Sequence, residues 1–344
     1  MERRQVVIPA SAVAAVPRLI ALDWGSSSLR AFLLGDFASV MAQRQDDWGL
    51  LHLPPPGGRT GFEHAFVAVA GPWLRQWPRL PVVACGMVGS AQGWQEAPYV
   101  ACPADVHALA AHAIRVATPL GAELWLAPGL RFDPPGGAPD VMRGEEIQVA
   151  GALELQPTKA ERACFILPGT HSKWAEVEGG RLVGFATHMT GELYALLRQH
   201  SILGRLMPPP AAAGSEPASR DARPDAAVDA AFIAGVHAAR ASTPGELGHQ
   251  LFAARTLGLT GRLEPALLGD YLSGLLIGHE IVAGLAASAR AGTAPLVLVG
   301  EPALCQLYAR ALEQFGARAD ATLANTAPQG LWAFARAAGL LSTH

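Results

Sequence analysis

Lysine is nearly absent from this chain of 344 residues. Of the 26 basic residues only Lys159 and Lys173 are lysines, and the others are arginines. We interpret the bias as genomic, because alanine, glycine and proline are abundant as well. The formal charge of −3 also leaves no excess of basic residues. A protein that grips nucleic-acid phosphates needs a basic face, so we expect no nucleic-acid partner.

Cysteines and long apolar runs are scarce too. The four cysteines form no CxxC pair, which disfavours a zinc site and favours reduced thiols in the cytoplasm. The longest apolar stretch, 271–289, contains His279 and Glu280, so it indicates a buried helix and no membrane partner. The N-terminal apolar run is short and broken by prolines, so we interpret 1–17 as an extension and not as a signal peptide.

Half of the residues are apolar, which allows a large core and excludes a disordered chain. Residue spacings typical of strands and of helices alternate along the chain, and its two halves begin with similar sequence patterns. We therefore predict an α/β fold with a cleft between two lobes, 18–150 and 151–344. The segment 207–227 is rich in proline and alanine and predicts a loop inside the second lobe.

The first half opens with a predicted β-hairpin. An apolar run at 19–22 ends in Asp23, and apolar residues resume at 29–34. The tip between them is small and polar, and its amides and hydroxyls suit phosphate oxygens. Asp23 at the strand end is placed to hold Mg²⁺. An ordinary polar turn explains the same residues. The candidate phosphate-binding residues are Gly25, Ser26, Ser27 and Ser28.

The second half repeats this pattern. A buried strand at 164–167 leads into a polar tip, so a clamp with two phosphate-binding tips is plausible. The candidates at this tip are Gly169, Thr170, His171, Ser172 and Lys173. Lys173 stands out in a lysine-poor chain, and we hypothesise that a compact ammonium is needed there. A third apolar strand, 296–299, ends at Gly300 and Glu301, where bare backbone can pack against a flat base.

Acidic residues gather around a predicted helix start near Arg143. Carboxylates in this position often interact only with the helix dipole. Near a bound phosphate, one of them can instead accept a proton from an attacking hydroxyl. Arg143 can bind a substrate carboxylate in bidentate fashion, and a structural salt bridge is equally compatible with the sequence.

The order of the three glycine motifs resembles the superfamily of actin, sugar kinases and heat-shock-protein ATPases. Four segments, 85–104, 140–148, 167–174 and 271–280, are closely similar to the 2-dehydro-3-deoxygalactonokinase family. The resemblance covers nearly the whole chain. It implies two RNase-H-like lobes and a kinase that uses ATP and Mg²⁺. The implied reaction phosphorylates the 6-hydroxyl of 2-dehydro-3-deoxy-D-galactonate in galactonate catabolism.

The resemblance also implies roles for individual residues. Related glycerol- and xylulose-type kinases carry a Gly-Asp-Gln motif before their second phosphate motif, and its Asp is their general base. Gly144-Glu145-Glu146 falls in the same place, so Glu145 is the first candidate base, followed by Asp23 and Asp140. Glu301 stands where related kinases usually have a small residue.

The loop 86–94 is expected to line the sugar-acid site. The candidate substrate residues are Met87, Ser90, Gln92, Trp94, Arg143 and Glu146. Simple packing accounts equally well for Met87 and Trp94. Two alternatives stay open: a kinase of 2-dehydro-3-deoxygluconate or another small sugar, and a non-catalytic nucleotide-binding sensor. A homodimer is left open as well.

Overall fold

A computed structural model describes residues 16–208, 225–292 and 294–341. Most of the predicted extension 1–17 and of the predicted loop 207–227 lies outside these residues. The predicted α/β class is confirmed, and the chain divides into two compact units. Unit 1 contains the residues up to Ala163, Ala175–Phe185 and the residues from Leu323 onward. Unit 2 contains Cys164–Trp174 and Ala186–Thr322.

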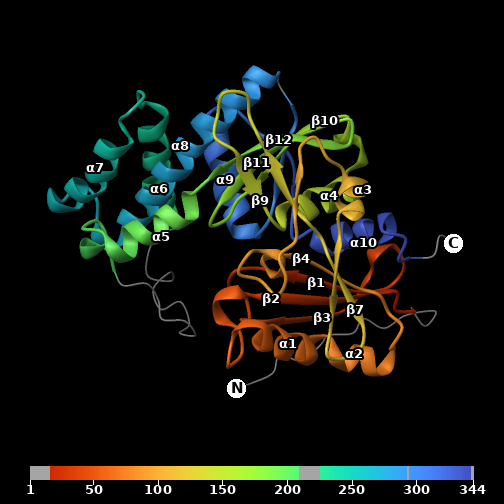
Figure 1. Ribbon diagram of the computed structural model, residues 1–344. Helices are drawn as coiled ribbons and strands as arrows, with labels where there is room; N and C mark the ends of the chain where they lie inside the picture. The colour runs from red at the N-terminus through yellow and green to blue at the C-terminus, as the bar shows by residue number, and fades with distance from the viewer. Residues whose placement is uncertain (1–15, 209–224, 293, 342–344) are drawn as a thin grey trace. The chain divides into compact units, whose positions relative to one another are not determined.

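Unit 1 is built on a six-stranded sheet in the order β3-β2-β1-β4-β7-β6 (Figure 1). Its strands are β1 (Leu19–Trp24), β2 (Leu29–Leu34), β3 (Val40–Asp46), β4 (Val82–Gly86), β6 (Ile114–Ala117) and β7 (Glu123–Leu126). The predicted opening hairpin is confirmed, because β1 and β2 pair antiparallel with Asp23 opposite Arg30. Strand β4 runs parallel to β1, so the carboxyl ends of both strands lie at one edge of the sheet.

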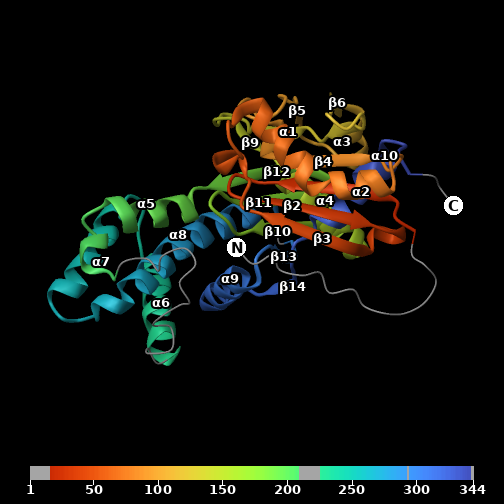
Figure 2. The same ribbon diagram turned by 90° about the horizontal axis from the view of Figure 1, so that it is seen from below.

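Helices cover both faces of this sheet (Figures 1 and 2). One face packs on α1 (Gly58–Val69) and α2 (Gly71–Gln76) through a cluster that includes Phe62 and Phe66. The other face carries α4 (Glu145–Leu155) and α10 (Ala327–Ala337). Burial of these apolar residues provides the main stabilisation of the unit.

Three short strands of unit 1 were not expected from the sequence. They form a separate sheet in the order β5-β8-β9. Their bounds are Tyr99–Ala101 for β5, Gly129–Phe132 for β8 and Asp140–Met142 for β9. The segment 133–139 connects β8 to β9, and β9 leads directly into the start of α4. Helix α3 (Val106–Ala111) precedes β6.

The sheet of the second half has the order β12-β11-β10-β13-β14, so it repeats the arrangement of the first five strands of unit 1's sheet. Its strands are β10 (Arg162–Leu167), β11 (Ser172–Glu178), β12 (Arg181–His188), β13 (Leu296–Val299) and β14 (Ala319–Leu323). Gly179 and Gly180 form the turn between β11 and β12, and both adopt positive φ. This repetition agrees with the similar openings of the two halves.

The described residues of unit 2 add five α-helices, of which α5 to α8 gather together in Figure 1. Their bounds are Thr190–His200 for α5, Asp225–Arg240 for α6, Leu247–Leu259 for α7, Leu268–Ala291 for α8 and Pro302–Gln314 for α9. Helices α6, α8 and α9 bury apolar residues against β10 and β13. The second half of α8 therefore lies beside the sheet, close to the tip that follows β10.

Helix α8 contains most of the apolar stretch that the sequence predicts to be a buried helix. The window Pro265–Ala289 is long and apolar enough to cross a membrane by length and composition, but 56% of it is buried inside the protein. Glycines allow α6 and α8 to approach closely. A Cβ at Gly274 would lie 1.9 Å from the carbonyl oxygen of Phe232, and one at Gly235 would lie 2.1 Å from that of Tyr271. Such packing is that of a core helix.

Helix α10 belongs to unit 1, although the predicted boundary near residue 150 places it in the second lobe. It packs on α4, β1 and β4. The approach to α4 is close, because a Cβ at Gly151 would lie 2.0 Å from the carbonyl oxygen of Thr326. The chain thus returns to unit 1 at its C-terminal end, which no local sequence pattern indicates.

Candidate functional site

The acidic cluster of unit 1 is assembled by main-chain contacts. Gly86 ends β4 with φ +91°, and a Cβ there would lie 2.5 Å from the carbonyl oxygen of Trp24. Gly144 precedes α4 with φ +109°, and a Cβ there would lie 3.2 Å from the Cα of Gly86. Both positions require glycine because of the positive φ and the close approach. The start of α4 is thereby set beside the end of β1, where Asp23 lies.

Asp23 is 5% exposed and forms an ion pair of 2.5 Å with Arg30 on the neighbouring strand. Burial raises the pKa of this carboxyl, and Arg30 opposes the rise. The charge of Glu145 also raises the pKa of Asp23, so the two carboxylates are electrostatically coupled. Two of the three candidate bases therefore lie in one cluster.

The two glutamates at the start of α4 differ in their surroundings. Glu145 is half-buried, and its Oε2 accepts a hydrogen bond of 3.1 Å from the backbone of Arg143. Glu146 is fully buried and accepts from the backbone of Gly144 at 2.7 and 2.9 Å. Burial, followed by the charge of Glu145, raises the pKa of Glu146 to about 8. Glu145 is thus the more accessible of the pair.

Arg143 is 9% exposed and only partly satisfied. Its Nη2 donates to the carbonyl oxygen of Ala97 at 2.8 Å, and the guanidinium lies over the ring of Tyr99 at 4.4 Å. Its Nε and Nη1 are buried and have no hydrogen-bond partner among the described residues. A buried guanidinium with unused donors is costly unless an anion or water satisfies it. The alternative of a structural salt bridge is not seen within the described chain.

Unlike Arg143, two other predicted substrate residues are accounted for by contacts within the protein. Trp94 is 6% exposed and packs in the core against Trp24, Phe62 and Phe66, which accounts for this residue by packing. Ser90 donates to the carbonyl oxygen of Met87 at 2.8 Å and closes a short turn.

Met87 is half-buried and Gln92 is exposed on the same loop. Asp140, the third candidate base, lies on β9, and its Oδ1 accepts from the backbone of Val141 at 2.7 Å.

The first predicted phosphate tip is a tight turn. The backbone N–H of Gly25 donates to the carbonyl oxygen of Ser28 at 2.9 Å. Ser26 and Ser27 are exposed. The carbonyl oxygens of Gly25 and Ser26 accept hydrogen bonds from the segment 50–51, so this segment supports the turn. The two exposed hydroxyls are available to solvent or a ligand.

In the second tip, the side chains of Ser172 and Lys173 form hydrogen bonds with the backbone of the tip itself. Ser172 is fully buried, accepts from the backbone of Gly169 at 3.3 Å, and lies 2.9 Å from the hydroxyl of Tyr308. Lys173 is 3% exposed and donates to the carbonyl oxygen of His171 at 2.8 Å. His171 is exposed and contacts Glu192. Thr170 is left at the surface of the tip.

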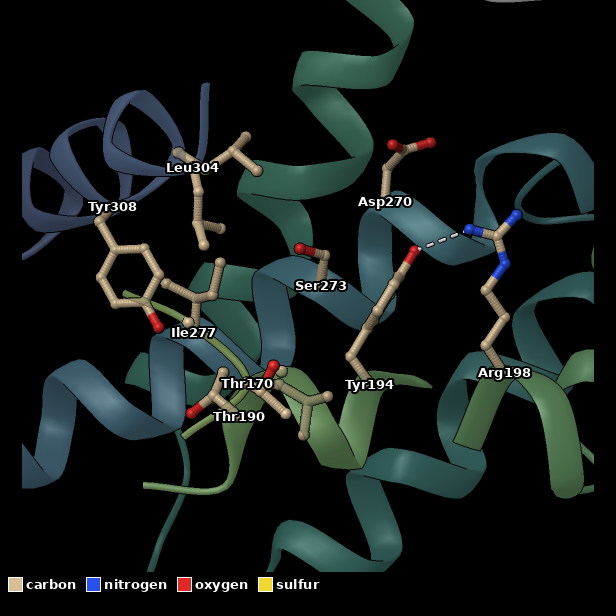
Figure 3. A pocket seen from close by; sticks show the side chains of 13 residues that line it. Thr170, Thr190, Tyr194, Arg198, Asp270, Ser273, Ile277, Leu304 and Tyr308 are labelled. Carbon is tan, nitrogen blue, oxygen red and sulfur yellow. Dashed lines mark hydrogen bonds between the residues drawn. The ribbon is translucent and has the colours of Figure 1, made fainter. Parts of the chain in front are cut away.

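A pocket of about 600 Å³ opens beside this second tip, within unit 2. Figure 3 shows two ends: Thr170, Thr190 and Tyr308 lie near one another, whereas Asp270 and Arg198 lie at the opposite side. The lining residues come from the tip, α5, α8 and α9: Gly169, Thr170, Thr190, Gly191, Tyr194, Arg198, Asp270, Ser273, Leu276, Ile277, Leu304, Leu307 and Tyr308. Apolar walls with a few polar groups are typical of a small-molecule site.

A family model described as 2-keto-3-deoxy-galactonokinase matches residues 23–334. The chain belongs to this family. It is 34% identical over 316 residues to the 2-dehydro-3-deoxygalactonokinase of Escherichia coli (strain K12), which covers 91% of the chain and 95% of that relative. It is 35% identical over 318 residues to a provisionally named enzyme of the same kind from Rhizobium meliloti (strain 1021), with 92% and 96% covered.

A crystal structure of a Sinorhizobium meliloti protein, provisionally assigned as a 2-dehydro-3-deoxygalactonokinase, has a similar fold. It aligns with a TM-score of 0.74 at 33% identity and covers 93% of this chain and 98% of that one. The predicted family is therefore confirmed, and the chain is a sugar-acid kinase by family. The matched region contains the acidic cluster, both tips and the pocket.

The third predicted motif lies beside the second tip and begins helix α9. Gly300 lies close to the second tip, since a Cβ there would lie 3.6 Å from the carbonyl oxygen of Pro168. The side chain of Glu301 caps α9, accepting from the backbones of Ala303 at 3.0 Å and Leu304 at 2.7 Å. A helix cap explains why a glutamate is found at this position.

Sequence reasoning missed the residues that line the pocket from α5, α8 and α9. Tyr194, Asp270 and Tyr308 lie outside every motif singled out from the sequence, whereas Ser273 lies within the segment 271–280. The segment 271–280 was a usable signal, because it resembles the family and contains the polar residue Ser273 and the buried residue Glu280.

Proposed function

We propose that the protein transfers the γ-phosphoryl group of ATP to the 6-hydroxyl of 2-dehydro-3-deoxy-D-galactonate in galactonate catabolism. The observation that carries the proposal is the family match over residues 23–334, which spans both polar tips. The acceptor end is assigned to the acidic cluster of unit 1 and the nucleotide end to the pocket of unit 2. The predicted cleft that joins the two ends stays a prediction.

The pocket supports the nucleotide end of the proposal. Its apolar wall, formed by Ile277, Leu304 and Leu307, suits a purine base, and its hydroxyl-rich end lies at the second tip. Backbone and hydroxyl groups bind phosphate without a basic side chain. The nucleotide phosphates are thus assigned to the end with Thr170 and Gly169.

Magnesium is compatible with the residues at the acceptor end. Asp23 provides a buried carboxylate that is electrostatically coupled to Glu145. Among the described residues no three His, Cys, Asp or Glu side chains form a ready-made metal site. Mg²⁺ is commonly held by one or two carboxylates together with water and substrate phosphates, so this donor set fits. When bound, the ion would neutralise phosphate charge, and Asp23 would hold it.

Glu145 is the proposed base. It lies at the start of α4, is half-buried, and is not the carboxylate that Arg30 neutralises. In the proposed step its carboxylate accepts the proton of the 6-hydroxyl as the oxygen bonds to the γ-phosphorus and ADP leaves. Most of the rate enhancement in such transfers comes from positioning and charge neutralisation.

Arg143 is the proposed partner of the substrate carboxylate. Its Nε and Nη1 carry buried N–H donors from which a substrate carboxylate can accept hydrogen bonds. Among the residues that the structure describes, no acidic side chain takes up these two donors. This arrangement favours a sugar acid over a neutral sugar.

An ATP-coupled kinase assay tests the proposal. Purified protein is offered 2-dehydro-3-deoxy-D-galactonate, its C4 epimer 2-dehydro-3-deoxygluconate, and a neutral hexose. We expect turnover with the galactonate-derived acid, a lower kcat/KM with the epimer and none with the hexose. Binding of ATP without phosphorylation of any of the three would support the alternative of a non-catalytic sensor.

A further inference from the structure

Glu280 is a buried carboxylate that the proposed mechanism does not use. It lies on α8, is 3% exposed, and receives hydrogen bonds at both oxygens. Trp174 Nε1 donates to Oε1 at 2.9 Å, and Tyr308 Oη donates to Oε2 at 2.7 Å. Thr190 Oγ1 also donates to Oε2. The three donors come from β11, α9 and α5, so one side chain ties three elements of unit 2 together.

These contacts determine the direction of a longer hydrogen-bond chain. The hydroxyl of Tyr308 has one proton, and Glu280 accepts it. In the contact of 2.9 Å between Tyr308 and Ser172, the serine must therefore be the donor. Ser172 Oγ in turn accepts the backbone N–H of Gly169. The chain runs from Gly169 through Ser172 and Tyr308 to Glu280.

The far end of this chain is the turn that lines the pocket. Gly169 and Thr170 line it, as do Thr190 and Tyr308, which both donate to Glu280. The N–H of Gly169 is directed at Ser172, which favours this conformation of the turn, and Thr170 is exposed at the pocket. Figure 3 shows Thr170, Thr190 and Tyr308 at the same end of the pocket.

A carboxylate is the side chain that this position requires. Glutamine has one acceptor oxygen and one NH₂ donor. If the NH₂ of the glutamine faces Trp174, it opposes the indole N–H, and both groups are donors. If its NH₂ faces Tyr308, the tyrosine proton turns to Ser172, and the proton of Ser172 loses its acceptor. Either arrangement leaves a buried donor unsatisfied, which is costly in a protein interior.

We propose that Glu280 is a positioning residue for the nucleotide phosphates, acting through Tyr308 and Ser172 on the turn 169–172. This inference rests on the proposed function, in which that turn binds the phosphates of ATP. Helix α8 can approach Trp174 closely, because Gly284, one turn after Glu280, leaves room for the Trp174 ring. A Cβ at Gly284 would lie 2.4 Å from that ring.

The test compares ligands with and without phosphates. Isothermal titration measures the affinity of wild type and Glu280→Gln for ATP, ADP and adenosine. We expect the variant to bind ATP and ADP about tenfold more weakly, which corresponds to one unsatisfied buried donor. Adenosine, which does not reach the turn, should bind within about twofold of wild type. Tyr271→Phe, on the same helix and outside the chain of hydrogen bonds, is the matched control.

Two of the following results would overturn the inference, and the third would refute its premise, which is the proposed function. Equal losses for ATP and adenosine would show that Glu280 only maintains the pocket. Unchanged affinity for all ligands would show that the hydrogen-bond chain has no role in binding. A wild-type protein that binds no nucleotide would refute the proposed function instead.

If Glu280→Gln does not fold, the same titrations are made with Tyr308→Phe and Ser172→Ala. Tyr308→Phe keeps the ring and removes the link between Ser172 and Glu280. The losses of ATP affinity in the two single variants and the double variant should be non-additive, because both residues belong to one chain. Additive losses would overturn the inference.

Discussion

Each of the two units contains a buried glutamate, and the two carboxylates are held in different ways. Glu280 of unit 2 accepts from an indole and two hydroxyls that lie on three separate elements. Glu146 of unit 1 accepts from backbone at the start of its own helix, with the charge of Glu145 beside it. One carboxylate is surrounded by donors, and the other has a second acid as neighbour.

The same contrast extends to the surroundings of each glutamate. Near Glu146, Nε and Nη1 of Arg143 and Nε of Arg30 are buried without hydrogen-bond partners among the described residues. Near Glu280, the side chains of Trp174, Ser172 and Tyr308 are all paired. Unsatisfied, mutually coupled groups are typical of sites that await a ligand or move a proton. Satisfied groups hold a neighbouring element in place, so the contrast agrees with the proposals of chemistry in unit 1 and positioning in unit 2.

The largest expected effect is on turnover. Glu145→Gln removes the proposed base and should lower kcat about 10²–10⁴-fold, with the affinity for ATP unchanged. Glu154→Gln, on the same helix but in a surface ion pair with Arg336, is the control and should keep normal activity. Normal turnover of Glu145→Gln would move the base assignment to Asp23, and Asp23→Asn would then be the variant to measure.

The next largest effect is expected on the KM for the sugar-acid acceptor. Arg143→Gln removes the charge and the two N–H donors assigned to the substrate carboxylate and should raise the KM for the sugar acid about 10–100-fold. The dissociation constant of ADP should not change, because the pocket lies on residues of unit 2. Arg131→Gln, in an exposed ion pair with Asp133, is the control. An unchanged KM would contradict the assignment, provided that thermal melting shows a folded variant.

A third effect is on the pH dependence of stability. The pKa of Glu146 is raised from 4.5 to about 8, so the folded chain keeps a proton that the unfolded chain has released at intermediate pH. This group's contribution to the free energy of unfolding should be complete below about pH 4.5 and be lost as the pH rises through about 8. Glu146→Gln is neutral throughout, so its stability relative to wild type should improve from pH 5.5 to pH 8.5 in urea denaturation. Parallel stability curves for the two proteins would refute the raised pKa.

The smallest expected effect is a difference in the free energy of unfolding between variants of the two lysines. Lys173 is 3% exposed, so Lys173→Arg forces a larger, planar group into a packed site and should lower the free energy of unfolding by about 1–3 kcal/mol. Lys159→Arg is the matched control, because Lys159 lies in a short surface turn and should tolerate the change. Equal stability of both variants would mean that composition alone explains Lys173.

Local patterns predicted the elements that end in polar tips. The apolar runs before Asp23 and Gly169 were long enough to identify β1 and β10, and glycine with hydroxyl residues marked the turns. The strands β8 and β9 were missed because they contain four and three residues, next to a segment rich in turn-forming residues. Such strands exist through pairing with each other, which a single sequence does not display.

The side-chain partnerships were less accessible than the elements. Glu280 was noted only as a charge that interrupts an apolar stretch, since its donors lie 28, 90 and 106 residues away. Trp94 was a candidate substrate residue as part of the loop 86–94, with packing as an equal alternative, and the aromatic cluster around it comes from β1 and α1. Roles that depend on contacts distant in sequence cannot be derived from residue spacing.

The contact between Gly86 and Gly144 matters to anyone who wishes to engineer the acceptor preference. The start of α4, which carries the proposed base Glu145, is placed by a contact of backbone against backbone at Gly86 and Gly144. Exposed positions of the neighbouring loop, such as Gln92, can therefore be randomised in a library without moving the carboxylates. The two glycines are the positions that such a library should leave untouched.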